Sequence, residues 1–232
     1  MNLFYQPLIG ENIHHLDEEE SRHCIKVLRK RQGELIHITD GKGSFYDAII
    51  VKDDPRQCTF TIKHQSKEKE KGFSVHIAIA PTKNADRIEW FVEKSVEIGV
   101  DHITLMDCQN SERSFIKTER LKKVAISAMK QSIKATLPEV SGIVAFHDLI
   151  NNHPATQRFI AYVDASNPRH LKDEATPGQH YLVLIGPEGD FSKEELEAAL
   201  ALGYRKVNLG DSRLRTETAG VVACHTLSLI NL

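Results

Sequence analysis

Apolar and polar residues alternate over short stretches in the first part of the chain, a pattern typical of β-strands. Strands are predicted at residues 34–39, 45–51 and 58–64. Links rich in Asp, Gly and Pro separate these strands and favour tight turns. A helix is predicted before them, from an N-cap at Asp17 to about Leu28, with Glu20 in position for a capping box. Short strands at this spacing predict a small β-barrel or sandwich.

From residue 73 onward, apolar strands alternate with stretches of helical periodicity. Strands are predicted at residues 73–80, 102–107, 142–146, 158–164, 181–185 and 206–209. Helices are predicted at residues 85–98, 118–135, from 192 onward, and at 216–229. This alternation predicts an α/β domain with a mainly parallel sheet. Residues 66–72 are charged and carry no apolar side chain, so they are the predicted linker between domains at 1–68 and 73–232.

Single residues mark several helix boundaries in the second domain. Gly99 can end the first helix in a left-handed conformation. Ser192 and Glu195 form a capping-box pattern at the start of the third helix. Thr216 is the predicted N-cap of the last helix. In the second helix, Ile133 falls on the predicted buried face.

The composition is that of an ordinary globular protein, with 41% hydrophobic and 27% charged residues among 232. No apolar run approaches the roughly 20 residues that span a bilayer. The first residues also lack the basic and apolar regions of a signal peptide. The four cysteines are scattered, without a Cys-x-x-Cys pair. We therefore expect reduced thiols, no metal site, no membrane contact and a cytoplasmic protein.

The formal net charge of −2 does not indicate a nucleic-acid-binding protein, but the distribution of charge is uneven. Residues 22–31 hold five basic and no acidic side chains, and residues 113–134 hold seven basic side chains and one acidic. Basic patches of this kind suit a phosphate backbone. Two solvated helix faces would give the same pattern, so both interpretations remain open.

Two loops that contain glycine each follow a predicted strand and lead into a predicted helix. The first is Gly-Pro-Glu-Gly at residues 186–189, and the second begins with Leu209 and Gly210. In an open α/β sheet, such loops lie together at the carboxyl ends of the strands, where ligands bind. Neither loop has the G-x-x-x-x-G-K-[ST] or G-x-G-x-x-G pattern of common nucleotide sites. We therefore expect a ligand other than a nucleoside triphosphate or a dinucleotide.

The second loop places two cations against a predicted helix start. Arg213 and Arg215 precede the last helix, where the helix dipole disfavours positive charge. Thr216 and Glu217, in contrast, suit an N-cap and a first helical turn. Because residues that break a local rule are candidates for function, an anionic partner is expected near the two arginines.

These motifs resemble those of the 16S ribosomal RNA uridine-N3 methyltransferase family, a family of the SPOUT class, over nearly the whole chain. In the first domain the resemblance rests on His23 and Val27-Leu28-Arg29. In the second domain it rests on Lys83, Arg87, Lys94, and residues 97–100, 111–114, 186–189, 209–210 and 214–219. The chain departs from the family pattern at Asp190, where glycine is common, at Ser212-Arg213, and at Lys134, where arginine is common.

The resemblance implies a PUA-like N-terminal β-barrel and a C-terminal α/β SPOUT domain with a trefoil knot. It implies the cofactor S-adenosylmethionine (SAM), bound by Leu184, Gly186, Pro187, Glu188, Gly189, Leu209, Gly210, Leu214 and Thr218. For the transfer to uracil N3, Arg215 is expected to stabilise charge on the carbonyls, and Glu217 or Glu188 to accept the proton. RNA contacts are expected from Arg22, Lys26, Arg29, Arg113, Lys130 and Lys134. The implied partners are 16S ribosomal RNA of the small ribosomal subunit and a second copy of the chain.

Three other functions are compatible with parts of the sequence. A relative of the same class would methylate the ribose 2′-oxygen, although such enzymes usually carry a segment rich in Ser and Asn in place of residues 215–218. A non-catalytic RNA-binding or ribosome-associated module would use the barrel alone. A hydrolase built on Glu188 would need a paired acid or a nucleophile with a histidine, and the sequence near Glu188 contains neither pattern.

Overall fold

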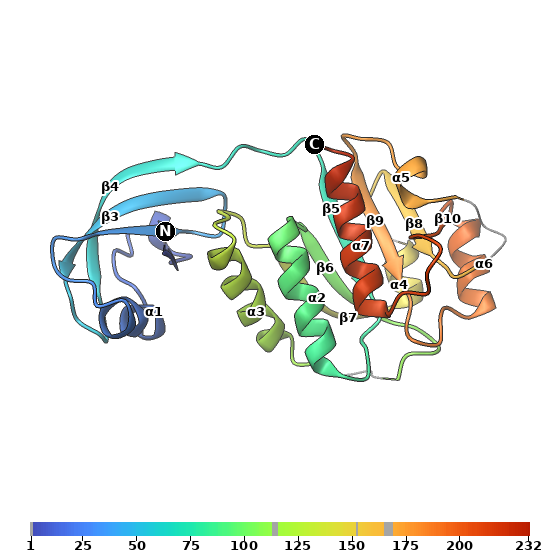
Figure 1. Cartoon of the computed structure of the whole chain (residues 1–232), viewed down its shortest axis with the longest axis horizontal. Coiled ribbons are helices and arrows are strands. Elements are labelled where there is room, and N and C mark those ends of the chain that lie inside the picture. The colour runs from blue at the N-terminus through green and yellow to red at the C-terminus, as the bar shows by residue number, and fades with distance from the viewer. Residues whose placement is uncertain (1, 113–115, 152, 165–168) are drawn as a thin grey trace. The chain divides into compact units, whose positions relative to one another are not determined.

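Figure 1 shows the computed structural model of the chain, which describes residues 2–112, 116–151, 153–164 and 169–232. The chain divides into two compact units. The first consists of Met1–Glu70 and Ile126–Leu137, and the second of Lys71–Ala125 and Pro138–Leu232. The break after Glu70 falls in the predicted linker. The membership of residues 126–137 in the first unit has no counterpart in the sequence pattern.

The first unit is built on a four-stranded sheet with the order β1-β2-β3-β4. Its strands are β1 (Leu3–Tyr5), β2 (Leu35–Thr39), β3 (Ser44–Lys52) and β4 (Thr59–Lys67). β1 and β2 are parallel, and the other neighbours are antiparallel. Tyr46, Ala48 and Ile50 are buried on one face of β3, as the two-residue period of a strand requires. The three predicted strands are confirmed, although β4 continues to Lys67 and takes two residues from the predicted linker.

The predicted helix of the first unit is confirmed as two consecutive segments, α1 (Glu18–Arg22) and a π-helix (His23–Val27). A short 3₁₀ turn (Ile9–Glu11) precedes them. Asp17 caps α1, because its Oδ1 accepts the backbone N–H of Glu20 at 2.8 Å. The Glu20 carboxylate accepts a hydrogen bond from Lys130 instead of completing the predicted capping box. Thr39 likewise donates to the carbonyl of Ala135 at 3.0 Å, and the backbone N–H of Leu137 donates to the carbonyl of Gly41 at 2.9 Å. Several hydrogen bonds therefore join residues 126–137 to this unit.

The second unit contains a six-stranded sheet with the order β10-β8-β9-β5-β6-β7. Its strands are β5 (Ser74–Ile79), β6 (His102–Asp107), β7 (Glu139–Ala145), β8 (Gln157–Ala161), β9 (His180–Ile185) and β10 (Arg205–Val207). Every neighbouring pair is parallel, which confirms the predicted sheet. The carboxyl ends of these strands therefore meet at one edge.

Helices cover both faces of this sheet. They are α2 (Ala85–Ile98), α4 (Phe146–Asn151), α5 (Leu171–Glu174), α6 (Lys193–Ala201) and α7 (Thr216–Leu229). A further helix, α3 (Thr118–Gln131), begins in the second unit, and its residues from Ile126 onward belong to the first. α2 and α7 lie side by side, and α7 also contacts β5 and β9 (Figure 1). α4 contacts β6, β7 and α6. Gly99 ends α2 in the predicted left-handed conformation, and Ser192 and Glu195 form the predicted capping box of α6.

Several predicted boundaries are wrong. β7 begins at Glu139 instead of residue 142, and β10 ends at Val207 instead of residue 209. α3 ends at Gln131 instead of residue 135, because Ile133 adopts a left-handed backbone (φ 54°). Ile133 is consequently 43% exposed and does not belong to the core. Phe146 begins α4 instead of ending a strand, and β8 ends three residues early at Ala161. α4 and α5 have no counterpart among the predicted helices.

The packing of α7 on the sheet and on α2 depends on Gly220. A Cβ atom at this position would lie 2.5 Å from Cε2 of Phe91 and 3.1 Å from Cδ1 of Ile79, both fully buried. We predict that Gly220→Ala lowers the free energy of unfolding by about 1–3 kcal/mol, because this overlap outweighs the roughly 1 kcal/mol gain in helix propensity. Urea unfolding measures the change. Gly142→Ala is the control, because its Cβ would meet only Thr118 Cγ2 at 3.8 Å; equal stability of the two variants would contradict the prediction.

A pair of partly buried histidines lies in the second unit. His153 Nε2 and His76 Nδ1 are 2.6 Å apart, and His76 Nε2 lies 2.8 Å from Thr104 Oγ1. Burial, and then the neighbouring His153 and His102, lower the pKa of His76 to about 3. Because the unfolded chain takes up this proton near pH 6.5 and the folded chain does not, folding loses stability as pH falls from about 6.5 towards 3.

We predict that His76→Gln reduces this acid sensitivity. Each proton taken up only on unfolding contributes a slope of about 1.4 kcal/mol per pH unit to the free energy of unfolding. Urea unfolding between pH 7 and pH 4.5 should therefore give a shallower pH dependence for His76→Gln than for the unchanged protein. His147→Gln, at an exposed position on α4, is the control. The same pH dependence of the free energy of unfolding in all three proteins would show that His76 does not cause the acid sensitivity.

Candidate functional site

Three loops at the carboxyl edge of the parallel sheet are held together by hydrogen bonds. The Glu188 carboxylate, in the loop after β9, accepts the backbone N–H of Lys83 from the loop after β5, at 3.3 Å. The side-chain amide of Asn110, which follows β6, donates to the carbonyl of Asp190 at 3.1 Å. The first predicted cofactor loop therefore lies against the residues that follow β5 and β6.

Two glycines of the predicted cofactor loops, Gly186 and Gly210, occupy positions that a side chain would disturb. A Cβ atom at Gly186 would lie 3.0 Å from Cε2 of Phe191, whereas one at Gly189 would make only an ordinary contact, 3.4 Å from Cβ of Asn110. Gly210 has φ 118°, which side chains of L-residues rarely allow. Both loops consequently depend on glycine for the path of their backbone, as the sequence predicts.

Asp190 replaces the glycine that is common in the resembled family, and its backbone explains the exchange. Its φ is 62°, a left-handed value that glycine adopts freely and that Asp and Asn tolerate best among other residues. Its carboxylate accepts the backbone N–H groups of Phe191 at 2.8 Å and Val163 at 3.3 Å. Burial raises the pKa of Asp190, while these bonds and the charge of Arg213 oppose the rise. Arg213 thus has an anionic neighbour within the protein.

The start of α7 differs from the predicted cap. Arg215 is the N-cap residue, with an extended backbone (φ −72°, ψ 156°), and no side chain caps this end of the helix. Thr216 is already helical and buried, so its prediction as the N-cap is wrong. The Arg215 side chain is exposed, and within the described part of the chain its guanidinium forms no ion pair or hydrogen bond. Arg213 is likewise exposed and forms no ion pair within 4.0 Å among the described residues, so what distinguishes Arg215 is its place in the pocket described next.

A pocket of about 360 Å³ lies at the start of α7 and alongside α2. It is lined by Asp86, Arg87, Trp90, Arg215, Glu217 and Thr218. The side chain of Glu217 is only 9% exposed, and its Oε1 lies 3.7 Å from Nε of Arg87. The pocket brings together three of the predicted site residues: Arg215, Glu217 and Thr218.

The remaining predicted cofactor residues lie along the loops in different degrees of exposure. Leu184 is fully buried in β9 and can offer a ligand only its backbone, and Pro187 is also buried. Glu188, Gly189 and Gly210 are exposed, and Leu209 and Leu214 are intermediate. Glu217 in the pocket and Glu188 in the loop after β9 are thus two separate candidates for a catalytic carboxylate.

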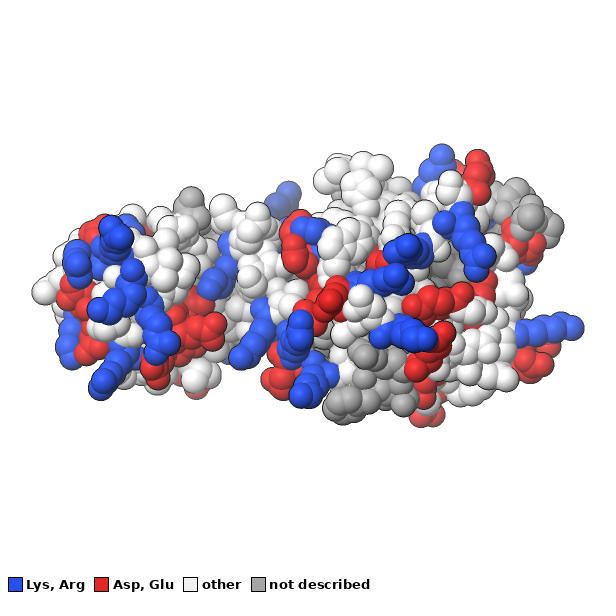
Figure 2. Space-filling view, turned by 60° about the horizontal axis from the view of Figure 1, so that its bottom comes forward, with Lys and Arg blue, Asp and Glu red and all other residues white. Residues whose placement is uncertain are grey.

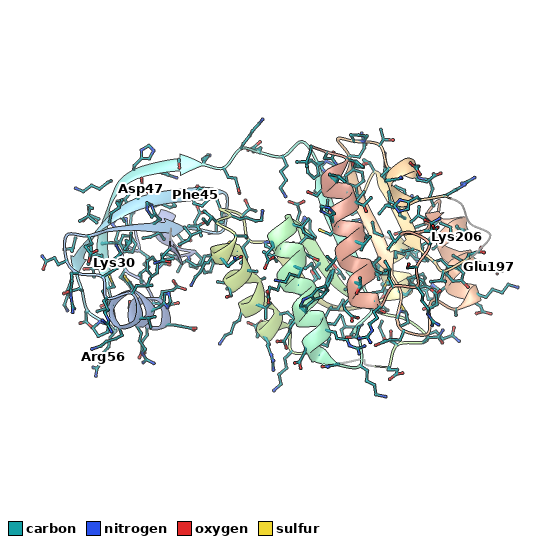
Figure 3. The ribbon with its side chains drawn as sticks, viewed as in Figure 1. Lys30, Phe45, Asp47, Arg56, Glu197 and Lys206 are labelled. Carbon is teal, nitrogen blue, oxygen red and sulfur yellow. The ribbon has the colours of Figure 1, made fainter. Side chains whose placement is uncertain are left out.

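The predicted RNA contacts in the first unit are partly neutralised by acidic neighbours. Figure 2 shows basic and acidic side chains interleaved over this unit. Ion pairs join Arg22 to Glu18 at 2.9 Å, Lys30 to Glu34 at 3.0 Å and Arg31 to Asp53 at 3.7 Å (Lys30 is labelled in Figure 3). Lys26 and Arg29 are exposed, and no carboxylate among the described residues pairs with either of them. Those two cations are therefore the strongest candidates for phosphate contacts in this run.

The other predicted RNA contacts have different surroundings. Lys130 is bonded to Glu20, a buried carboxylate whose pKa is raised by burial and lowered by that same lysine. Lys130 is therefore engaged in an ion pair within the first unit. Lys134 is partly exposed, and Arg113 lies outside the described residues.

Arg87, Trp90 and Asp86 are the pocket residues that were not predicted as site residues. Arg87 matches the family pattern, but the sequence alone assigns it no role. Trp90 is the only tryptophan of the chain and is 43% exposed on α2, one turn after Arg87. A tryptophan on the polar face of a predicted helix is the signal that could have identified this surface.

Comparison with known proteins assigns the chain to a family. A profile of the RNA methyltransferase domain matches residues 69–228, which is more than half of the chain, and a profile of the RNA methyltransferase PUA domain matches residues 16–63. The chain belongs to the RNA methyltransferase family. It is also 28% identical, over 225 residues, to "Ribosomal RNA small subunit methyltransferase E" of Aquifex aeolicus, across 95% of this chain and 96% of that protein.

Solved structures extend the similarity to the whole fold. A "probable rRNA-methyltransferase" from Porphyromonas gingivalis is 46% identical, with a TM-score of 0.94 over 100% of this chain and 98% of that one. A methyltransferase from Legionella pneumophila, solved with bound SAM, is 26% identical, with a TM-score of 0.89 and the same coverage. The predicted α/β fold with a PUA domain and the predicted enzyme class are confirmed.

No helix in the described part of the chain is long and apolar enough to cross a membrane. The described residues also contain no group of three or more His, Cys, Asp or Glu side chains placed to hold a metal ion.

Proposed function

We propose that this RNA methyltransferase transfers a methyl group from SAM to N3 of a uridine in 16S ribosomal RNA. The observation that carries the proposal is the similarity, along almost the full length of both chains, to the small-subunit rRNA methyltransferase of Aquifex aeolicus. The structure from Legionella pneumophila that contains SAM supports the choice of cofactor. The Leu-Arg-Thr-Glu-Thr-Ala sequence at residues 214–219 supports N3 of uracil over the ribose 2′-oxygen.

Glycine in both loops at the carboxyl edge of the sheet supports a role in holding the cofactor, because a residue without a side chain lets backbone groups approach a ligand closely. We propose that Leu184, Gly186, Pro187, Glu188, Gly189, Leu209, Gly210, Leu214 and Thr218 hold SAM. When bound, SAM supplies an electrophilic methyl group, and the protein supplies binding and orientation.

Arg215 is proposed to stabilise the transition state. Uracil N3 must lose its proton during the transfer, and negative charge then develops on the two neighbouring carbonyl oxygens. A guanidinium offers several N–H donors in a fixed plane, which suits such oxygens. The Arg215 guanidinium lines the pocket and has no internal partner among the described residues, so binding a ligand does not require it to break a contact.

Glu217 is the better of the two candidate proton acceptors. Its carboxylate lines the pocket together with Arg215, and its Oε2 is buried without a hydrogen-bond partner among the described residues. Glu188 is exposed and its Oε1 is engaged with the backbone of Lys83. A general base must lie within hydrogen-bond reach of the proton it removes, and both candidates otherwise have the right chemistry.

RNA is proposed to bind through Arg22, Lys26, Arg29, Lys130, Lys134 and Arg113. We predict that the double substitution Lys26→Ala, Arg29→Ala weakens binding of a 16S RNA fragment and reduces the slope of log Kd against log salt by about 2, one for each lost phosphate contact. Filter binding at several salt concentrations measures both quantities. Lys52→Ala, at an exposed lysine paired with Asp54, is the control. An unchanged salt slope in the double variant would show that these cations do not contact phosphate.

Further features of the family class complete the proposal. We propose that the sheet of the first unit closes into a PUA-like barrel and that the C-terminal residues form a trefoil knot, supported by α7 packing back on β5 and β9. A homodimer in which α7 forms part of the interface is supported by Leu229, which is 56% exposed at the end of that helix. We place the protein in the cytoplasm because its proposed substrate is ribosomal RNA.

A deletion strain tests the proposed function in the cell. Ribosomal RNA from the strain, with and without a plasmid copy of the gene, is digested and its modified nucleosides are mapped by mass spectrometry. The proposal predicts that one N3-methyluridine in 16S RNA disappears on deletion and returns with the gene. Unchanged N3-methyluridine, together with loss of a 2′-O-methylated nucleoside, would support the ribose methyltransferase instead.

A further inference from the structure

The pocket beside α7 contains a buried charge that the protein itself only half satisfies. The Glu217 side chain is 91% buried; its Oε1 faces Arg87 at 3.7 Å, and its Oε2 has no hydrogen-bond partner among the described residues. An unpaired buried carboxylate oxygen is costly unless a donor reaches it. Because this atom belongs to a residue that lines the pocket, the missing donor is expected on a ligand that enters there.

The same pocket offers a flat apolar surface. Trp90 lines it and is 43% exposed, although large aromatic side chains are normally well covered. Unpaired bases stack on aromatic side chains, and each such contact strengthens binding markedly. A volume of about 360 Å³ lies within the range of small-molecule sites, about 300–1,000 Å³.

The polar groups of the pocket match one base. The Watson–Crick edge of uracil presents a carbonyl acceptor, the N3–H donor and a second carbonyl acceptor. The pocket supplies two guanidiniums, Arg87 and Arg215, which donate only. It also supplies two carboxylates: Glu217, which is buried, and Asp86, which is exposed and lies 3.8 Å from Arg120. Glu217 is therefore the acceptor that we match to the base. Cytosine presents an unprotonated N3 to the carboxylate and an amino group to a guanidinium, so two of its three positions are mismatched.

We propose that this pocket is the subsite for the target uracil, with Trp90 as its stacking surface and Arg87 as the residue that positions the Glu217 carboxylate towards N3–H. The inference rests on the proposed function and adds the residues that select the base. Glu217 accepts from N3–H, Arg215 and Arg87 donate to the two carbonyls, and Arg87 also holds the Glu217 carboxylate in place. Selectivity for uracil over cytosine then arises at Glu217, because only an acceptor satisfies N3–H.

Trp90 makes the test direct, because it is the only tryptophan and its fluorescence reports on a stacked base. The full-length protein is titrated with uridine monophosphate (UMP) and with cytidine monophosphate (CMP). We expect UMP to quench the emission and to bind at least about fivefold more tightly than CMP, the lower end of the discrimination that a good base contact gives. Equal quenching and equal Kd values for the two nucleotides would overturn the proposal.

Three variants separate the roles of the pocket residues. Glu217→Gln, whose amide can donate to cytosine N3, should remove the preference for UMP. Arg87→Met should weaken UMP binding and reduce the preference for UMP over CMP, because the Glu217 carboxylate loses the cation that lies 3.7 Å from it, whereas Arg87→Lys, which keeps the charge, should restore part of both. Trp90→Ala should weaken UMP binding in calorimetry, whereas Trp90→Phe should largely restore it. Retention of the UMP preference in Glu217→Gln would also overturn the proposal.

Two controls exclude other causes. Leu200→Ala removes a side chain of nearly the same exposure, 42%, on α6, and should leave nucleotide binding unchanged. Light scattering is run over the same protein concentrations. If Trp90 emission follows the monomer–dimer equilibrium and ignores UMP, Trp90 belongs to a subunit interface and the base subsite is refuted. Formation of N3-methyluridine by a protein that fails these tests would refute the subsite alone and leave the proposed function standing.

Discussion

Replacement of Arg215 by alanine is expected to lower kcat for methyl transfer by about 10²- to 10³-fold at saturating RNA and SAM, the usual effect of removing one donor from a developing oxyanion. The physical reason is the loss of a guanidinium that has no partner within the described part of the chain and lines the pocket of Glu217. Binding of SAM should change little, because that ligand is assigned to the backbone of the loops. Arg215→Lys should retain part of the activity, since it keeps the charge and loses the planar fork.

Single-turnover kinetics with radiolabelled SAM measure this effect apart from binding. Lys193→Ala removes an exposed cation from α6, where it pairs with Glu197, and should keep the full rate (Figure 3 shows Glu197). A wild-type kcat in Arg215→Ala would show that Arg215 does not stabilise the transition state. A change in KM alone would mean that it only helps to bind RNA.

Substitution of Gly186 by alanine is expected to weaken SAM binding by about 10- to 100-fold, which corresponds to the roughly 1–3 kcal/mol that overpacking usually costs. The new Cβ would lie 3.0 Å from the ring of Phe191. That ring is 3% exposed and packs against Phe146, so the loop backbone must move instead. Activity should fall with SAM affinity, and RNA binding should not.

Isothermal titration calorimetry with SAM measures the change, and thermal unfolding confirms that the variant is folded. Gly142→Ala serves again as the matched glycine, because its Cβ would have ordinary contacts. Identical SAM affinity of Gly186→Ala and the unchanged protein would mean that the loop after β9 does not hold the cofactor.

Elements with strong local signals could be predicted from the sequence. α2 and α7 have the predicted bounds. In α2 a regular apolar period fills the helix and Gly99 permits the left-handed end. The wrong boundaries lie where local signals were absent or misleading. Ile133 takes a left-handed conformation without being glycine, and the apolar run before Phe146 continues from a strand directly into a helix. Thr216 has the chemistry of an N-cap, but the extended backbone belongs to Arg215.

The candidate site also contains features that could be predicted from the sequence and features that could not. The glycine loops could be predicted because the need for glycine is local, and the structure supplies its reason at Gly186 and Gly210. The contact between Arg87 and Glu217 could not, because 130 positions separate the two residues and only the packing of α2 on α7 brings them together. The neutralisation of Lys130 by Glu20 is likewise a tertiary contact, and a count of charges along the sequence overstates that basic patch.

The most direct test of the central claim is the identity of the nucleoside that the purified protein makes. Full-length protein is incubated with SAM carrying a labelled methyl group and with either 16S ribosomal RNA or the intact small ribosomal subunit. The RNA is then digested to nucleosides and analysed by chromatography and mass spectrometry. The account predicts label in N3-methyluridine, and its loss with Arg215→Ala. Label in a 2′-O-methylated nucleoside, or no incorporation into either RNA substrate, would contradict it.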